Sequence, residues 1–257
     1  MRTLRKGMLG ADVRYLQYIL DIPVTGIFDQ VTEDAVKEAQ GEHCLVQDGS
    51  VGPLTRKALK LTDFHVHIFD KSTKVWVAGT PYKSESYPLR TLKEWAKLEK
   101  ADCTFNLAFF NMKGKGTDKF GVPIKGRTLT YVKSKGYDVG YGGTKERITL
   151  DHNNIFAGYK LGISNGRAQL VTNTDRRARN ATGRLKDGRF FIVQTVTVSS
   201  EKDMVEYMLD NYDVDLMLLQ DGGGSVGMYN AKADVLIAGE REGTNGRPVA
   251  TVICVKD

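Results

Sequence analysis

An acidic residue, three glycines and a hydroxyl follow an apolar run near the C-terminal end of the chain. The run is Val214–Leu219, and the motif after it is Asp221–Ser225, Asp-Gly-Gly-Gly-Ser. A short apolar segment that ends at a turn is typical of a strand in a sheet covered on both faces. Glycines remove the Cβ atoms that keep ligands away from the backbone. The motif therefore predicts backbone N–H groups that hold an anion beside Asp221, with an ordinary glycine-rich turn as the alternative.

A second group of chemically active residues lies in a basic segment. Between Lys125 and Arg189 there are fourteen basic and five acidic residues, so we expect an anionic partner. Arg177 and Arg179 are two positions apart, and in an extended chain both guanidinium groups would lie on one face and could bind a phosphate. A solvated basic face is the alternative. No nucleic-acid-binding motif is present, so phosphate ranks above nucleic acid.

The sequence contains no metal-binding or disulfide pattern. The three cysteines, Cys44, Cys103 and Cys254, have no CxxC spacing, which argues against a zinc site or a disulfide framework. His65 and His67 share one face of a predicted strand, but the pattern offers no third ligand. We therefore predict no metal and no cofactor.

Length and composition predict a globular protein with two domains, residues 1–60 and 64–257. The chain has 257 residues, 41% hydrophobic and 26% charged, as in folded proteins. Its net charge of +6 lies beyond residue 60. No apolar stretch is long enough to span a bilayer, and no signal peptide is evident. We expect synthesis in the cytoplasm and release, if it occurs, by a route without a signal peptide.

An internal repeat in residues 1–60 predicts a small all-α three-helix bundle. The pattern of residues 26–36 recurs 23 positions later. In each copy a glycine turn precedes a helix, and a threonine, Thr32 or Thr55, is expected to be the N-cap. Pro53 suits the first turn of the last helix.

The repeat region resembles the peptidoglycan-binding domain type 1 family over nearly its whole length. The resemblance implies a non-catalytic module that docks on bacterial cell wall, and a helical adaptor without wall affinity is the alternative. The matching residues are Gly10–Val13, Leu16, Gln17, Leu20, Val24–Phe28, Thr32, Ala35, Val36, Gln40, Val46–Pro53, Thr55 and Leu59.

Residues 64–257 are predicted to form an α+β domain with a mixed, β-rich sheet core. We expect strands at 64–69 and 74–78 to pair as a hairpin. Ser200, with Asp203 three residues later, indicates a capping box at a helix start. Asn106 is polar within an apolar strand, so its amide either bonds inside the protein or faces a pocket. The other predicted elements are a helix over 89–100 and strands at 103–111, 128–132, 168–172, 190–196, 214–219, 234–238 and 248–255.

The same region resembles the phosphodiester glycosidase family, which includes phosphodiester α-N-acetylglucosaminidase. The chain differs from the family pattern at two places. Leu107 and Ala108 stand where the family usually has two glycines, and Leu219 and Gln220 stand where it has Asn-Leu. The motifs that carry the resemblance are Asn106–Phe110, Arg179–Gly183, Lys186–Arg189, Asp221–Ser225 with Met228, and Arg247–Val249.

The resemblance implies hydrolysis of a sugar-1-phosphodiester at its glycosidic bond. Cations would stabilise the leaving phosphate, and a carboxylate would act at the sugar carbon. We assign catalytic roles to Asp221, Arg179 and Asn106, with Asp175 as a weaker candidate for a second carboxylate. The predicted substrate-binding residues are Arg177, Gly222, Gly223, Gly224, Ser225, Arg247 and Phe110.

Together the two regions predict a cell-wall-directed phosphodiester glycosidase, for example one acting on the N-acetylglucosamine-1-phosphate linkage of wall teichoic acid. The wall-binding module would raise the local concentration of that bond. The expected partners are peptidoglycan or another wall polymer and a phosphate-bearing glycan. The expected location is the bacterial cell wall or the extracellular space, as for a phage or prophage lysin. A catalytically inactive wall carbohydrate-binding protein and a peptidoglycan hydrolase (endolysin) are the alternatives, although the zinc-ligand set or Cys/His pair of an amidase is not evident.

Overall fold

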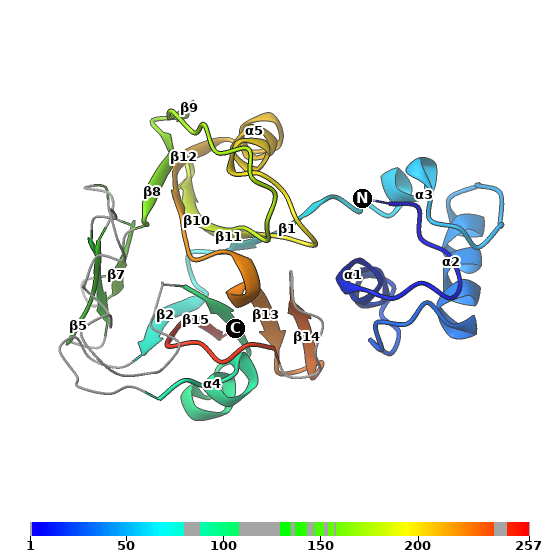
Figure 1. Ribbon diagram of the computed structural model, residues 1–257, viewed down its shortest axis with the longest axis horizontal. Coiled ribbons are helices and arrows are strands. Elements are labelled where there is room, and N and C mark those ends of the chain that lie inside the picture. The colour runs from blue at the N-terminus through cyan, green and yellow to red at the C-terminus, as the bar shows by residue number, and fades with distance from the viewer. Residues whose placement is uncertain are drawn as a thin grey trace. The chain divides into compact units, whose positions relative to one another are not determined.

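The chain folds into two compact units, Met1–His65 and Val66–Asp257, seen in a computed structural model (Figure 1). The structure describes residues 2–79, 88–107, 129–134, 137–142, 146, 148–151, 154–156, 158–238 and 246–256. Within these ranges, none of the helices has the length and apolar character needed to cross a membrane.

The N-terminal unit is helical, as the repeat predicts. Its helices are α1 (Ala11–Ile19), α2 (Gln30–Glu42) and α3 (Pro53–Ala58), and Pro53 occupies the first turn of α3 as expected. The helical class is confirmed, whereas packing of the three helices as a regular bundle stays a prediction. The buried apolar side chains include Leu4, Val13, Leu16, Phe28, Val36 and Val51.

A buried amide closes the first copy of the repeat. Gln17 Nε2 donates to Thr32 Oγ1 and to the carbonyl oxygen of Ile27, both at 2.9 Å. Gln17 Oε1 accepts a bond from Gly26 N at 2.8 Å. Gly26 has a φ of 78°, a backbone conformation that favours glycine. One side chain therefore ties α1 to the turn and to α2.

The second copy is closed in the same way by Gln40, 23 positions after Gln17. Gln40 Nε2 donates to Thr55 Oγ1 at 3.1 Å and to the carbonyl oxygen of Ser50 at 2.9 Å. Its Oε1 accepts from Gly49 N at 2.9 Å. The sequence repeat is therefore also a repeat of hydrogen-bond partners.

The repeated threonines are not helix caps, which corrects the sequence prediction. The N-cap of α2 is Asp29, whose carboxylate accepts from Thr32 N at 2.9 Å. The N-cap of α3 is Gly52. A carboxylate is a strong N-cap acceptor, and Asp29 accepts from both the backbone N–H and the hydroxyl of Thr32. The oxygen of that hydroxyl accepts from Gln17 Nε2.

The C-terminal unit is β-rich (Figure 1), and its largest sheet has six strands. The helix α5 (Glu201–Asn211) packs against this sheet and begins with the predicted capping box of Ser200 and Asp203. β12 has the bounds predicted from the apolar run. The strand order is β1 (Phe64–Phe69), β11 (Phe190–Thr195), β10 (Asn180–Leu185), β12 (Val214–Leu219), β8 (Lys160–Ser164) and β9 (Arg167–Ala168).

A second sheet has five strands, and α4 (Leu92–Glu99) packs against it. The described registers in both sheets are antiparallel, so the α+β class with a β-rich core holds, and no parallel pairing is among them. The strand order is β14 (Val235–Ala238), β13 (Gly227–Asn230), β3 (Cys103–Asn106), β15 (Thr251–Lys256) and β2 (Lys74–Gly79).

The predicted hairpin of residues 64–69 and 74–78 is wrong. β1 belongs to the six-stranded sheet, and β2 pairs with β15 in the five-stranded sheet. The chain changes sheet between them, so strands that are neighbours in sequence are not hydrogen-bonded neighbours. A third sheet has the order β5 (Tyr137–Gly142), β4 (Leu129–Ser134), β7 (Asn154–Phe156) and β6 (Ile148–Asp151).

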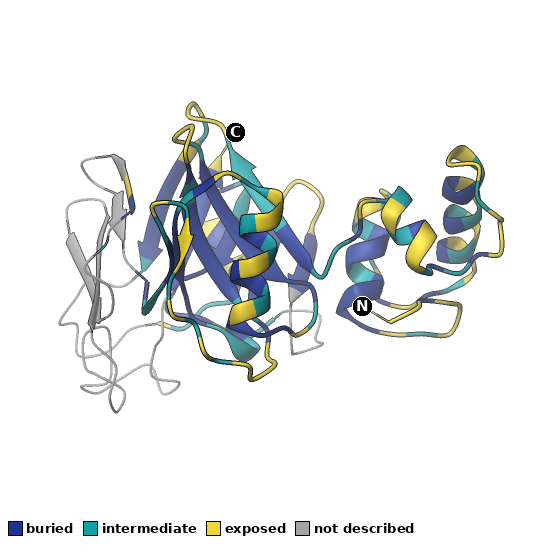
Figure 2. Ribbon diagram, turned by 90° about the horizontal axis from the view of Figure 1, so that it is seen from above, coloured by how far each residue is buried: buried dark blue, intermediate teal, exposed yellow. Residues whose placement is uncertain are grey.

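Aromatic side chains join the six- and five-stranded sheets. Phe69 of β1 lies 6.1 Å from Phe105 of β3 and 5.9 Å from Phe190 of β11, measured between ring centroids. His67 lies 4.9 Å from Phe105. Every residue of β11 is buried, and the strands of both sheets are mostly dark blue in Figure 2. The apolar core of the unit therefore includes this space between the sheets.

Candidate functional site

A pocket of about 430 Å³ in the C-terminal unit lies beside the turn that follows β12. Three cations and two carboxylates line it, together with two glycines of the turn. Such a lining suits a polar anionic ligand, because guanidinium and ammonium groups bind phosphate oxygens. The charged lining residues are Lys160, Asp175, Arg177, Arg179 and Glu201, and the glycines are Gly222 and Gly223.

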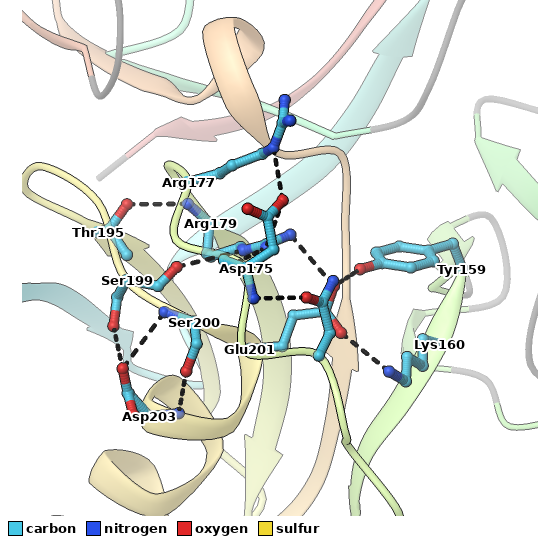
Figure 3. Close-up of polar contacts among 11 residues, drawn as sticks. Tyr159, Lys160, Asp175, Arg177, Arg179, Thr195, Ser199, Ser200, Glu201 and Asp203 are labelled. Carbon is cyan, nitrogen blue, oxygen red and sulfur yellow. Dashed lines mark hydrogen bonds and ion pairs between the residues drawn. The ribbon is translucent and has the colours of Figure 1, made fainter.

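Glu201 is the centre of the pocket's hydrogen-bond network (Figure 3). Its side chain is only 3% exposed. Oε1 accepts from Arg179 Nη1 and Asn173 Nδ2, each at 3.2 Å, and from the hydroxyl of Tyr159. Oε2 accepts from Lys160 Nζ at 2.9 Å. Because four donors occupy this carboxylate, its evident task is to hold the surrounding side chains in place.

The sequence interpretation missed Glu201. The residue follows the capping Ser200, where an acidic side chain in the first helical turn is explained by the helix dipole alone. Its partners are 22 to 42 residues away. The available signal was an acidic residue close to the start of a helix that follows a buried strand, β11.

The two predicted arginines line the same pocket but differ in burial. The side chain of Arg179 is 11% exposed, and that of Arg177 is 61% exposed. Arg179 donates to Ser199 O at 3.3 Å and to Asp175 O at 2.6 Å, in addition to Glu201. The backbone of Arg177 forms a bridge with Ser199. Arg179 is thus held rigidly by protein acceptors, while most of the Arg177 side chain is open to solvent.

Asp175 contacts both arginines. Its Oδ2 accepts from Arg177 Nε at 2.7 Å and lies 4.0 Å from Arg179 Nη2. Asp175 N donates to Asn173 Oδ1 at 2.8 Å, which fixes the backbone at this point. In Figure 3 the Asp175 carboxylate lies next to Arg177. The predicted phosphate-binding arginines therefore meet at one carboxylate of the chain itself.

The glycine turn has close backbone contacts that only glycine allows. A Cβ at Gly222 would lie 2.8 Å from the carbonyl oxygen of Ala178, and Gly223 has a φ of 64°. The predicted patch of accessible N–H groups is wrong at Gly223, and the flanking Asp221 N is also bonded inside the protein. Asp221 N donates to Leu107 O at 3.0 Å, and Gly223 N donates to Ala178 O at 2.8 Å. The turn therefore brings backbone against backbone and lines the pocket with Gly222 and Gly223.

The Asn106 amide bonds inside the protein, which is one of the two alternatives that the sequence left open, and its predicted catalytic role stays a prediction. Its side chain is 1% exposed, and its Nδ2 donates to Asp221 O at 3.0 Å. Its Oδ1 accepts from Gln194 Nε2 and from Gly227 N, each at 3.1 Å. With these bonds the amide joins the two sheets and fixes the backbone at Asp221.

A second amide completes this link between the sheets. Asn180 Nδ2 of β10 donates to the carbonyl oxygen of Asn106 at 2.7 Å. Gln220, one of the departures from the family pattern, donates through Nε2 to Thr182 Oγ1 at 2.9 Å. Gln220 is therefore accommodated inside the protein, next to the turn.

The other predicted site residues lie outside the pocket lining. Asp221 is 7% exposed and Ser225 is 5% exposed, and both belong to the turn. Gly224 lies in the 3-10 helix η1 (Gly223–Ser225). Arg247 follows Gly246, whose position is beside Leu236 of β14. Phe110 lies outside the described residues, so its predicted role stays a prediction.

Metal binding has no evident site in the described part of the chain. No group of three His, Cys, Asp or Glu residues there could hold a metal ion. The polar groups that line the pocket are its cations, its carboxylates, the Asn173 amide and the Tyr159 hydroxyl.

Comparison with known families and structures separates the two units. Residues 11–59 match the family described as "Putative peptidoglycan binding domain". No curated protein matches the chain. The zebrafish N-acetylglucosamine-1-phosphodiester alpha-N-acetylglucosaminidase catalytic domain, auto-inhibited by its pro-peptide, aligns over 76% of this chain and 84% of its own, with 16% identity and a TM-score of 0.50. The N-terminal resemblance is therefore confirmed, and the C-terminal one is confirmed at the level of the fold.

Two further solved structures align with lower TM-scores. A hypothetical protein from Synechocystis has 13% identity and a TM-score of 0.49 and covers 75% of this chain and 58% of its own. A putative exported protein from Burkholderia pseudomallei has 10% identity and a TM-score of 0.47 and covers 76% of this chain and 74% of its own.

Proposed function

We propose that this protein is a cell-wall-directed hydrolase that cleaves a sugar-1-phosphodiester at its glycosidic bond. The observation that carries the proposal is the pocket beside the turn after Asp221, which Lys160, Arg177 and Arg179 line together with Gly222 and Gly223 of that turn. Cations suit the phosphate of such a substrate, and a carboxylate of the adjoining turn would suit chemistry at the sugar carbon. The family match of residues 11–59 supports a wall polymer as the partner.

The proposed reaction breaks the bond between sugar C1 and the phosphate oxygen. Water adds to C1, and the phosphate leaves as a monoester that remains attached to the rest of the polymer. The leaving group gains negative charge as the bond breaks, so nearby guanidinium groups lower the barrier. Arg179 is the better preorganised of the two arginines, because Ser199 O, Asp175 O and Glu201 fix its orientation. Arg177, which is exposed, would close on the phosphate from the solvent side.

Asp221 is our candidate for the carboxylate that acts at C1. Glu201 is less suited to that role, because four donors already occupy its oxygens. The backbone of Asp221 is held on both sides, by Leu107 O and by Asn106 Nδ2. Such support would keep the carboxylate at a fixed distance from a sugar bound over Gly222 and Gly223.

The N-terminal unit would serve the reaction by raising the local concentration of substrate. A module that binds wall polymer makes the second, catalytic encounter intramolecular. A phosphodiester between N-acetylglucosamine C1 and a wall glycan, as in the linkage of teichoic acid, combines the two chemistries. We therefore propose that linkage as the substrate class.

The experiment treats purified Gram-positive walls with the full-length protein and measures soluble polymer, new reducing sugar and new phosphate monoester. We expect all three products from the wild type. Asp221→Ala should lower the rate at least about a hundredfold, because it removes a reacting group. Wall binding should be unchanged. Wall binding without any of the three products would refute the hydrolase, and soluble muropeptides alone would indicate a peptidoglycan hydrolase.

A catalytically inactive wall-binding protein is the second candidate. It is favoured by the internal satisfaction of the pocket, since Arg179 and Glu201 bond mainly to each other and to neighbouring protein groups. In that case soluble sugar-1-phosphodiesters would bind without turnover, and Asp221→Ala would alter affinity only.

A further inference from the structure

Asp175 lies where a bound anion would neutralise the two arginines of the pocket (Figure 3). Its Oδ2 accepts from Arg177 Nε at 2.7 Å and lies 4.0 Å from Arg179 Nη2. Guanidinium groups bind carboxylate and phosphate oxygens with the same donor geometry. Asp175 therefore takes, within the chain, a place that a ligand anion could take.

Of the two carboxylates in the pocket, Asp175 is the one that can be displaced. The side chains of Asp175 and Arg177 are 57% and 61% exposed, and exposed ion pairs contribute little to stability. Glu201, by contrast, is 3% exposed and bonded to four donors. A ligand anion can replace the contacts of Asp175 while Glu201 stays in position.

The charges of the lining suit a ligand with a single negative charge. Three cations face two carboxylates, so one positive charge is left for a ligand. A phosphodiester carries one negative charge, whereas a phosphate monoester carries nearly two at neutral pH, because its second pKa is about 6. The extra charge of a monoester would lie close to the Asp175 carboxylate, and like charges at such distances repel.

We propose that Asp175 is a specificity-determining residue that admits singly charged phosphodiesters to the arginine pair and disfavours doubly charged phosphate monoesters. This inference rests on the proposed function in treating the pocket as a phosphate site. It assigns Asp175 to ligand selection in place of the role of second catalytic carboxylate. Hydrolysis converts a diester into a monoester, so the Asp175 charge that disfavours monoesters would also speed release of the product.

The test compares the full-length wild type with Asp175→Asn, which keeps the size of the side chain and removes its charge. Asp187→Asn is a matched control, because Asp187 Oδ2 accepts from Arg189 Nε at 2.8 Å with the same two-residue spacing, away from the pocket lining. Dimethyl phosphate is the diester probe, and methyl phosphate is the monoester probe. Their dissociation constants are measured by NMR titration about two pH units above the second pKa of the monoester. Thermal unfolding verifies that each variant is folded.

We expect Asp175→Asn to bind methyl phosphate roughly tenfold more tightly, with less than about threefold change for dimethyl phosphate. Asp187→Asn should change neither affinity. Equal gains for both probes, no gain for methyl phosphate, or no binding of either probe to any variant would each overturn the inference.

Wall hydrolysis is scored separately, so the two proposals can fail independently. A selectivity shift in Asp175→Asn without turnover by the wild type supports the inference and contradicts the proposed function. Turnover by the wild type that Asp175→Asn abolishes, with the affinity ratio unchanged, would make Asp175 a catalytic carboxylate and overturn the inference.

Discussion

The two units build their polar networks around different kinds of side chain. In the N-terminal unit the centres are Gln17 and Gln40, neutral amides that are 1% and 2% exposed and bond within their own repeat. In the C-terminal unit the centre is Glu201, a carboxylate that holds Lys160 and Arg179 at the edge of a pocket. A neutral centre fixes the shape of a turn. A charged centre also fixes the position of cations that a ligand can use.

Removing the charged centre should have the largest effect. Glu201→Ala leaves Lys160 and Arg179 without this carboxylate in a largely buried site, and we expect a loss of about 3 kcal/mol in the free energy of unfolding. Urea unfolding measures it. Glu206→Ala is the control, because Glu206 lies on the same helix, is 56% exposed and pairs with Lys202. The control should lose less than about 0.5 kcal/mol, and equal losses would contradict the role given to Glu201.

Removing one of the two buried glutamines should lower the free energy of unfolding by less, and by a similar amount in both repeats. Gln40→Ala leaves Gly49 N and Thr55 without their amide partner, so we expect a loss of about 2 kcal/mol, and Gln17→Ala should match it within about 1 kcal/mol. Hydrogen exchange of the Gly49 amide reports the opening of the turn. Gln30→Ala, at an exposed position of α2, is the control. The proposed binding of phosphodiester by the C-terminal pocket should not change, and a change would mean that the two networks are coupled.

Acid should have the smallest effect on the free energy of unfolding. The two units should lose stability in different pH ranges. Burial lowers the pKa of His67 to about 4, so the unfolded chain, with a pKa near 6.5, takes up the proton first. The free energy of unfolding of the C-terminal unit should therefore fall by about 1–2 kcal/mol as the pH falls from about 6.5 to 4. The loss is smaller than the full pKa shift would give, because His67 is only half-buried and solvent screens its charge. Hydrogen bonds from Thr32 and Ser50 lower the pKa of Asp29 and Asp48, so in the N-terminal unit their contribution is lost only below about pH 4.

Hydrogen exchange resolved by residue can follow both units across this pH range. His67→Phe keeps an aromatic ring next to Phe105 and should abolish the loss in the C-terminal unit between pH 6.5 and 4. A wild-type unit that keeps its full stability down to about pH 4 would contradict the effect assigned to His67.

Local signals in the sequence were sufficient for much of the fold. The apolar run at Val214–Leu219 gave β12 with its observed bounds, and Ser200 with Asp203 gave the capping box of α5. The 23-residue repeat gave the helical class of the N-terminal unit. Each of these features depends on residues close together in the chain, so periodicity and capping rules apply directly.

The errors arose where a local rule competed with a partner from elsewhere. Thr32 has the right type for an N-cap, but Asp29 takes that role and Gln17 binds the threonine hydroxyl. The strands at 64–69 and 74–78 are adjacent in sequence, but their apolar faces serve different sheets. Sequence patterns do not encode which distant strand supplies the better partner.

In the candidate site, too, residues close together in sequence were predicted, and a residue defined by distant partners was missed. The sequence identified Arg177, Arg179 and Asp175, which line one pocket, because their short spacing and their charge stand out in the chain. It did not identify Glu201, since a buried carboxylate is recognised only by its donors, and those come from three other segments. The roles of all these residues in binding and catalysis stay predictions.

The side-chain amide of Asn106 also has a consequence for the order in which the protein folds. Its hydrogen-bond partners are 88, 115 and 121 residues further along the chain, so the bonds cannot form until most of the C-terminal unit has been synthesised and both sheets have docked. Contacts of such long sequence separation are slow to form and come late in folding. A partly folded intermediate would therefore lack the support for the Asp221 turn, and a chain that displays the finished pocket has also finished its core.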